Sequence, residues 1–266
     1  MSPERDLSVA LVVAHPDDDA YGMAGTIALH AHNPRFRFVL IHATDGAAGQ
    51  IAPGVDATPD TLGACRRRED AAAWHAHGRP PDRHEWLDYP DGGVSDVPFE
   101  ELVERIASIL REERPRVVGT FGPDGITGHP DHITVGRATD AAFERLRTEG
   151  CSGMERLVHG AMRQSTFLRW NESRSAHGLE PWDPGRMYHL RPVPDESIGL
   201  EVDTRSVATH ILAGLLEHRS QRHVIIDGTL TRDQQLRVLG RESYVVAWPP
   251  RAAGAPLLAD VFESLD

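Results

Sequence analysis

Continuous apolar runs alternate along this chain with stretches whose apolar residues recur every three or four positions. Two runs, 8–14 and 37–43, consist mainly of aliphatic and β-branched residues, which is typical of strands covered on both faces. Weaker runs predict further strands at 84–89, 116–121, 157–162 and 198–203. We expect these runs to be the strands of a sheet.

Helical patterns lie between the runs. The clearest is 98–113, where apolar residues recur at spacings of three and four and form an amphipathic stripe. Similar patterns predict helices over 22–32, 61–77, 131–147 and 204–218. The alternation of strands and helices predicts a three-layer, Rossmann-like α/β fold, with a mostly parallel sheet and helices on both faces.

The chain is expected to form a single domain over 1–266, a length that can bury a sizeable core. One stretch, 163–197, is rich in Pro, Trp, Arg and Gly and has no clear period. We expect it to be a long loop excursion over the surface or over the functional site. Residues 49–60 also have the composition of a loop.

The charge pattern narrows the possible partners. The formal net charge is −12, which argues against a nucleic-acid partner and against an anionic membrane surface. All 28 basic residues are Arg, so mechanisms that need a lysine Schiff base or a phosphate-binding lysine are excluded. A small-molecule substrate fits this composition better.

Two cysteines, Cys65 and Cys151, lie far apart and form no metal-binding or redox pair. A disulfide framework is therefore not expected, which fits a reducing cytoplasm. The apolar stretch Leu7 to Ala14 is too short to span a membrane and lacks the basic flank of a signal peptide. We expect a cytoplasmic protein without membrane insertion, and a homo-oligomer stays open.

The first candidate site follows the first strand, where His15 to Asp19 place one imidazole and three carboxylates within five residues. So much negative charge costs stability unless a cation or hydrogen-bond donors offset it. The alternative is a helix N-cap aspartate with solvated neighbours. Because consecutive side chains leave an extended backbone on opposite sides, Asp17 and Asp18 are not expected to share one role.

The second candidate site is Gly128 to His132, which follows the predicted strand 116–121. An H-x-x-H pair alone is a weak signal, but two His/Asp clusters at the ends of two strands predict a common ligand site. Three nitrogen or oxygen ligands with an open position are typical of catalytic zinc. The same ligand types also suit Fe²⁺ and other divalent ions.

These two motifs together resemble the PIG-L/LmbE-like family of zinc-dependent N-acetylglucosaminyl deacetylases, which includes enzymes of the mycothiol and bacillithiol pathways. The stretch Gly25 to Ala28 is similar to the segment that follows the first motif in that family. Weaker matches support the resemblance along most of the chain: Thr44-Asp45-Gly46 with Gly49, Arg66 with Glu69, Tyr89-Pro90-Asp91-Gly92, and His218-Arg219-Ser220-Gln221.

The resemblance implies a metal centre and a catalytic pair. His15, Asp18 and His132 would hold Zn²⁺, with Fe²⁺ as a possible substitute. Asp17 would be the general base that deprotonates the attacking water. His129, in its protonated form, would stabilise the oxyanion of the tetrahedral intermediate or protonate the leaving amine.

The resemblance also implies the substrate, an N-acetylated amino sugar or glycoside whose hydroxyls Arg66 and Asp91 would contact. Two alternatives stay open: an amidase for a larger amide conjugate, and a catalytically weak metal- or sugar-binding protein. Asp19 and Thr127 stand where relatives often carry Glu and Tyr, which bears on substrate fit and rate. The motif His218 to Gln221 would either line the site or hold the last helix.

Overall fold

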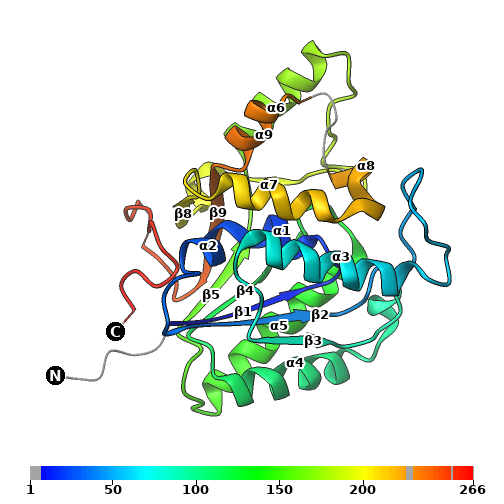
Figure 1. The fold of residues 1–266 in the computed structure, drawn as a ribbon. Helices are drawn as coiled ribbons and strands as arrows, with labels where there is room; N and C mark the ends of the chain where they lie inside the picture. The colour runs from blue at the N-terminus through cyan, green and yellow to red at the C-terminus, as the bar shows by residue number, and fades with distance from the viewer. Residues whose placement is uncertain (1–6, 226–229, 253, 266) are drawn as a thin grey trace.

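The computed structural model describes residues 7–225, 230–252 and 254–265. A seven-stranded sheet lies at its centre, in the order β3-β2-β1-β4-β5-β9-β8 (Figure 1). The strands of this sheet are β1 Leu7–Val13, β2 Phe36–His42, β3 Arg83–Trp86, β4 Val117–Phe121, β5 Arg156–Gly160, β8 Leu200–Asp203 and β9 Arg241–Trp248. All six strands that the sequence predicts are present.

The sheet is mostly parallel, as predicted. β1 pairs in parallel with β2 on one side and β4 on the other, and β3 and β5 extend the parallel part outward. From Val9 to Val13, β1 is buried completely or nearly so. Helices cover both faces at this position, which explains why the sequence of β1 shows no apolar–polar alternation.

β9 is the strand that the sequence analysis misses. It lies between β5 and β8 and is antiparallel to both, so the sheet is mixed at this end. Its first residues, Arg241 to Ser243, are polar, and Tyr244 is its one fully buried residue. Because most of β9 is only partly covered, it lacks the continuous apolar run by which the central strands are recognised.

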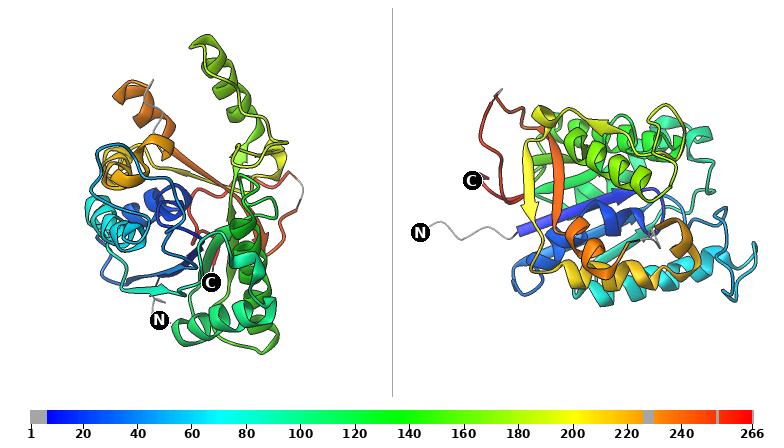
Figure 2. Two further views of the ribbon diagram at one scale, coloured as in Figure 1. Left: turned by 90° about the vertical axis from the view of Figure 1, so that its right-hand side faces the viewer. Right: turned by 90° about the horizontal axis from the view of Figure 1, so that it is seen from above.

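Helices cover both faces of the sheet, which confirms the three-layer α/β fold (Figures 1 and 2). One face carries α4 Phe99–Glu113 and α5 Pro130–Thr148. The other carries α1 Asp18–Gly22, α2 Ala24–Leu29, α3 Leu62–His77 and α7 Ala208–Glu217. The helix predicted over 22–32 is present as α2, but its bounds are wrong, because a separate helix begins at Asp18 and the helical path breaks at Met23.

The excursion 163–197 contains a helix, so the expectation of a loop is wrong for α6 Gln164–Ala176. α6 projects away from the sheet (Figures 1 and 2), and Phe167 is its only buried residue. Because α6 packs mainly against β6, β7 and Trp182 and buries little of its surface, it has no apolar stripe from which to predict it. At its base, β6 Met162–Arg163 pairs with β7 Pro192–Val193.

The remaining elements are short. Residues 49–60 contain neither helix nor strand, as predicted. After α7 come α8 Arg222–Ile225 and α9 Arg232–Val238, and single 3-10 turns occupy Val94–Asp96, Asp195–Ser197 and Arg219–Gln221. Within the three described ranges, none of the helices combines the length and apolar character needed to cross a bilayer.

Candidate metal centre and active site

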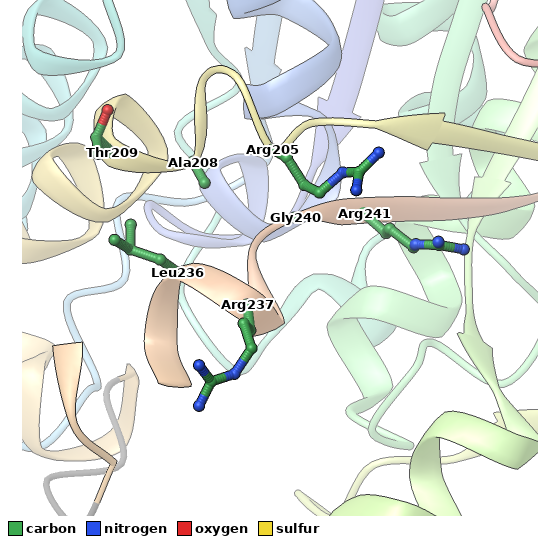
Figure 3. A pocket seen from close by; sticks show the side chains of 7 residues that line it. All are labelled: Arg205, Ala208, Thr209, Leu236, Arg237, Gly240 and Arg241. Atoms are coloured by element: carbon green, nitrogen blue, oxygen red, sulfur yellow. The ribbon is translucent and has the colours of Figure 1, made fainter. Parts of the chain in front are cut away.

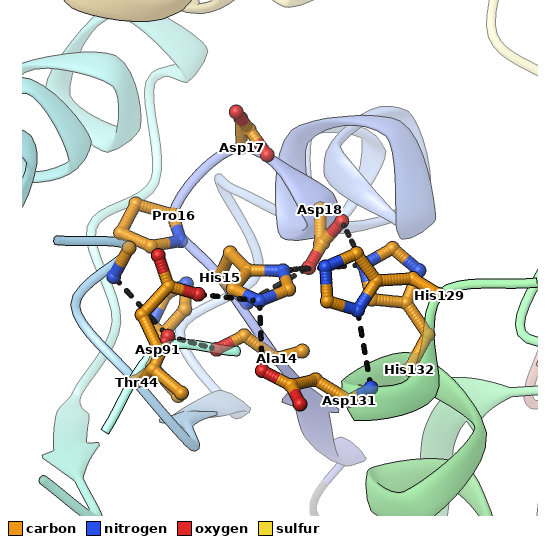
Figure 4. A network of polar contacts seen from close by, with 12 residues as sticks. Ala14, His15, Pro16, Asp17, Asp18, Thr44, Asp91, His129, Asp131 and His132 are labelled. Carbon is orange, nitrogen blue, oxygen red and sulfur yellow. Dashed lines mark hydrogen bonds and ion pairs between the residues drawn. The ribbon is translucent and has the colours of Figure 1, made fainter. Parts of the chain in front are cut away.

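The predicted site residues gather at the carboxyl edge of the parallel strands (Figure 4). The strand order reverses between β1 and β4, the position where ligands bind in sheets of this kind. His15 follows β1, and His132 lies in the first turn of α5, which follows β4. His15 Nε2 lies 3.0 Å from Asp91 Oδ1, and the Thr44 amide donates to Ala14 O over 2.9 Å.

Three candidate ligand groups form a small triangle. His15 Nδ1 lies 3.2 Å from His132 Nε2, and the Asp18 carboxylate faces both nitrogens, with Oδ2 3.2 Å from His15 Nδ1 and Oδ1 3.2 Å from His132 Nε2. Metal–ligand bonds of about 2.0–2.1 Å at tetrahedral angles place ligand atoms about 3.3 Å apart. The two imidazoles and the carboxylate therefore fit a divalent ion with an open fourth position. His129 lies close to both rings, and His15, His129 and His132 offer nitrogens within 4.8 Å of one another as a further candidate ligand group.

The hydrogen bonds around the two imidazoles set their orientation. His15 Nε2 faces Asp91 and also Asp131, at 3.3 Å, while His132 Nδ1 lies 3.0 Å from Gly125 O. Each ring thus has an acceptor for the proton on the nitrogen that points away from the triangle. Burial lowers the pKa of His15. The carboxylates of Asp131, Asp18 and Asp91 raise it by more than burial lowers it, so that the net shift is upward.

Asp131 is a site residue to which the sequence analysis gives no role. Its side chain is fully buried, and its carboxylate accepts from the Gly92 amide over 2.8 Å and from the Val94 amide over 3.2 Å. It therefore ties the loop after β3 to His15. The only signal in the sequence is its position between the two histidines of Gly128 to His132.

Asp17 and Asp18 point in different directions, as their adjacency predicts. Figure 4 shows Asp18 directed at the two imidazoles and Asp17 displaced from them. Asp17 has a positive φ of 105°, and its carboxylate pairs with Arg66 Nη2 over 3.0 Å. Burial raises the pKa of Asp17 to about 7. The charge of Asp18 adds to this rise, and the charge of Arg66 opposes it.

His129 is the N-cap of α5, and its Nδ1 accepts the Asp131 amide over 3.1 Å. Its proton therefore resides on Nε2. Burial and the neighbouring rings of His15 and His132 lower the pKa of His129 to about 4. The ring is thus a neutral donor at neutral pH, where the sequence analysis expects a protonated one. Tyr188, from the excursion, lies edge-on to His129 with ring centroids 5.3 Å apart.

Comparison with known proteins agrees with this geometry. The family model for the PIG-L GlcNAc-PI de-N-acetylases matches residues 10–143. The chain belongs to the PIG-L family. It is 31% identical to the 1D-myo-inositol 2-acetamido-2-deoxy-alpha-D-glucopyranoside deacetylase 2 of Saccharopolyspora erythraea, over 92% of this chain and 94% of that protein. As a PIG-L protein it is an enzyme, a metal-dependent amide hydrolase that removes acetyl groups.

Solved structures show the same fold. An N,N'-diacetylchitobiose deacetylase from Pyrococcus horikoshii matches with a TM-score of 0.59 and 20% identity, over 91% of this chain and 84% of that one. The 4-carboxy-2-hydroxymuconate hydratase GalB from Pseudomonas putida KT2440 matches with a TM-score of 0.62 and 17% identity, over 92% and 98%. Because a hydratase shares the fold, the similarity to these two structures shows the fold and not the activity.

The remaining PIG-L motifs support the loops around the metal centre. Arg66 is 4% exposed and donates to the backbone oxygens of Pro16 and Gly46, and a side chain at Gly46 would overlap its guanidinium. Glu69 accepts from the amide and the hydroxyl of Ser220, over 2.8 and 2.6 Å. The motif His218 to Gln221 thus fastens the loop after β2 to α3. The contact of Arg66 with sugar hydroxyls stays a prediction.

Two of the pockets in the described part of this PIG-L protein lie away from the metal ligands. The first, of about 280 Å³, lies among α7, α9 and the start of β9 (Figure 3). Two of its three arginines are paired, Arg205 with Asp203 and Arg241 with Glu201. The second, of about 250 Å³, lies at the ends of β4 and β5, beside the loop that leads to His129. The polar side chains in its lining are Asp124, His159 and Arg191.

Proposed function

We propose that this protein hydrolyses the acetamido group of an N-acetylglucosamine glycoside, with Zn²⁺ held by His15, Asp18 and His132. The observation that carries the proposal is the close approach of three ligand groups at the carboxyl edge of the sheet: the two imidazole nitrogens lie 3.2 Å apart, and each lies 3.2 Å from one oxygen of the Asp18 carboxylate. Zinc is favoured because two imidazoles and one carboxylate with an open position are typical of catalytic zinc sites.

When bound, the metal polarises the acetyl carbonyl and lowers the pKa of the attacking water toward 7. The general base is Asp17, whose pKa burial raises to about 7, close to the value at which a carboxylate best accepts a proton at neutral pH. Arg66 orients this base, because its guanidinium holds both the Asp17 carboxylate and the Pro16 carbonyl. We assign Arg66 this positioning role in addition to the contact with sugar hydroxyls that the family resemblance implies.

His129 acts on the opposite side of the acetyl group. Its Nε2–H, the tautomer set by the Asp131 amide, donates to the carbonyl oxygen as negative charge develops there. Tyr188, which lies edge-on to the His129 ring, is placed to contact the bound sugar. Asp91 accepts from the Ala48 amide over 2.7 Å and from His15 with one oxygen each, so its contact with a sugar hydroxyl would use a remaining lone pair.

The substrate class rests on the curated relatives. The protein of Saccharopolyspora erythraea and one of Acidothermus cellulolyticus, 29% identical over 97% of this chain, are both named as deacetylases of an inositol glycoside of 2-acetamido-2-deoxyglucose. We assign the pocket at the ends of β4 and β5 to the part of the glycoside remote from the acetamido group. Its polar side chains could bind the hydroxyls of such an aglycone.

The test is an acetate-release assay on purified protein. The panel contains the inositol glycoside of N-acetylglucosamine, a methyl glycoside, free N-acetylglucosamine and a larger amide conjugate. We expect the highest kcat/KM for the inositol glycoside, loss of turnover with a chelator, and recovery on adding Zn²⁺. Release of acetate from none of the sugars, or a chelator-insensitive rate, would contradict the proposal.

A further inference from the structure

A second cluster of metal-ligating side chains lies outside the catalytic centre. His42 ends β2, Asp70 lies in α3 and His84 lies in β3; we call these three residues the α3 cluster. The side chains of His42 and Asp70 are fully buried, and that of His84 is 20% exposed. The three elements are neighbours in the fold, but the roles assigned above make no use of these side chains.

The distances within the α3 cluster suit a single ion. His42 Nδ1 lies 2.9 Å from His84 Nε2, and Asp70 Oδ2 lies 3.8 Å from the same nitrogen of His84. The other Asp70 oxygen, Oδ1, lies 3.8 Å from the other nitrogen of His42, Nε2. One ligand atom from each residue lies within 4.8 Å of the other two. Ligands of a tetrahedral zinc-type ion lie about 3.3 Å apart, so the cluster could close on an ion by small side-chain movements.

Asp70 is the decisive member. Within the described part of the chain, neither of its carboxylate oxygens has a hydrogen-bond partner, although the side chain is fully buried. A buried carboxylate without donors is costly, because burial removes its hydration and nothing replaces it. The neighbouring Asp19 is also fully buried, which adds a second negative charge at the same depth.

We propose that the α3 cluster is a second metal site, in which His42 Nδ1, His84 Nε2 and one oxygen of Asp70 bind a divalent transition-metal ion of the zinc type. The other nitrogen of His42 lies 3.4 Å from Asp19 Oδ1. Asp19 would thus accept the proton of the ligating ring, the arrangement that orients histidine ligands in metal sites. The partial exposure of His84 leaves room for water as the fourth ligand.

An ion in the α3 cluster would be structural. It would link β2, β3 and α3, and through Asp19 it would connect to the turn that carries Asp17 and Asp18. The catalytic reaction does not require it, so the proposal stands apart from the proposed function. The expected effect is a higher melting temperature at full loading, because an ion that binds only the folded chain stabilises it.

The experiment counts metal per chain by elemental analysis after dialysis at a fixed excess of free Zn²⁺. We expect two equivalents in the wild type and one in Asp70→Asn and in His84→Asn. Asp18→Asn should also hold one, in the α3 cluster. The matched control is His75→Asn, which alters an exposed histidine of the same helix and should keep two. Co²⁺ loading gives a second readout, because each tetrahedral site contributes its own visible absorption.

The variants separate the outcomes. Suppose that wild type holds one equivalent of zinc, Asp18→Asn holds none and Asp70→Asn still holds one. This result would overturn the second site while leaving the catalytic centre intact. Equal metal content in wild type, Asp70→Asn and His84→Asn would also overturn it. If Asp70→Asn fails to fold, His84→Asn decides, since His84 is partly exposed and its replacement leaves the core in place.

Discussion

At the scale of single residues, the division of labour between Asp17 and Asp18 is decided by backbone direction. Asp18 lies in the first turn of α1 and reaches both ligand histidines, whereas Asp17 precedes the helix with positive φ and reaches Arg66. Such a φ is strained for a residue other than glycine, and strain of this kind is found at functional sites. Two chemically identical side chains thereby receive different partners.

The substitutions Asp17→Asn and Asp18→Asn should therefore have opposite signatures. Asp17→Asn should keep one catalytic metal ion and near-normal substrate binding, while kcat falls by about 10²–10⁴, the contribution of a positioned base. Asp18→Asn should lose metal affinity, with activity partly restored by excess Zn²⁺. Metal content after dialysis and kcat at saturating metal would distinguish them. The reverse pattern would show that the base and the ligand are exchanged.

Asp131 and Asp91 contact the same nitrogen of His15 but should not be equivalent. Asp131 is fully buried and also holds the loop after β3, so Asp131→Asn should lower metal affinity by about 10–100-fold, as for other carboxylates that support a ligand. Asp91→Asn should keep the metal, because Asp131 still orients His15, and should lower kcat/KM for the sugar. Competition with a chromogenic chelator measures the first effect. Equal metal loss in both variants would contradict the distinction.

At the scale of elements, a residue of β9 caps the N-terminus of α2. Within the first turn of α2, the amides of Gly25 and Thr26 donate to the Glu242 carboxylate over 2.6 and 2.8 Å, and the hydroxyls of Thr26 and Tyr244 donate to it as well. The first amides of a helix have no partners within the helix. A residue from a strand far along the chain thus caps a six-residue helix beside the metal centre.

Glu242→Ala should lower the free energy of unfolding by about 3 kcal/mol, because it leaves buried donors without an acceptor. Glu242→Gln, which keeps one acceptor, should have a smaller effect. Urea unfolding monitored by circular dichroism measures both. The control is Glu172→Ala on the exposed part of α6, for which we expect a change within about 0.5 kcal/mol. A Glu242→Ala protein as stable as the control would contradict the capping role.

At the scale of the whole molecule, histidines are part of the core. Among the described residues, His42, His77 and His218 are completely buried, and the ring of His77 occupies the space beside Gly214. Burial is the main cause that lowers the pKa of His77 and of His218 to about 4. The folded state thus holds these rings neutral, whereas the unfolded chain protonates them near pH 6.5.

These buried histidines should therefore make acid destabilising, against the opposite contribution of Asp17, whose raised pKa of about 7 lets the folded state bind a proton first. As the pH falls from about 6.5 toward 4, the unfolded state binds more protons, and each such histidine lowers the free energy of unfolding by about 1.4 kcal/mol per pH unit. His77→Gln should reduce this dependence of the free energy of unfolding on pH by the contribution of one histidine. His75→Gln, at an exposed position, should leave the dependence unchanged. Urea midpoints at several pH values provide the measurement. An unaltered slope in His77→Gln would contradict the assignment.

The sequence alone determined the elements that are buried on both faces or carry a complete apolar stripe. The central strands were predictable because burial on both faces makes them continuous apolar runs, and the helix over 98–113 because burial of one face imposes a period on its residues. The meeting of His15, Asp18 and His132 was predictable for a related reason: the segments that carry them follow strand ends that meet at one edge of a parallel sheet. Local pattern and fold point to the same site.

Tertiary structure decided what depends on partners distant in sequence. β9 and α6 are only partly covered, so their residues carry little periodic signal. The bonds from Asp131 to the loop after β3, and from Glu242 to α2, join segments separated by 39 and 217 residues. The α3 cluster arises in the same way, from three elements that meet only in the folded sheet. No spacing within the chain encodes such contacts, because they form only when packing brings distant segments together.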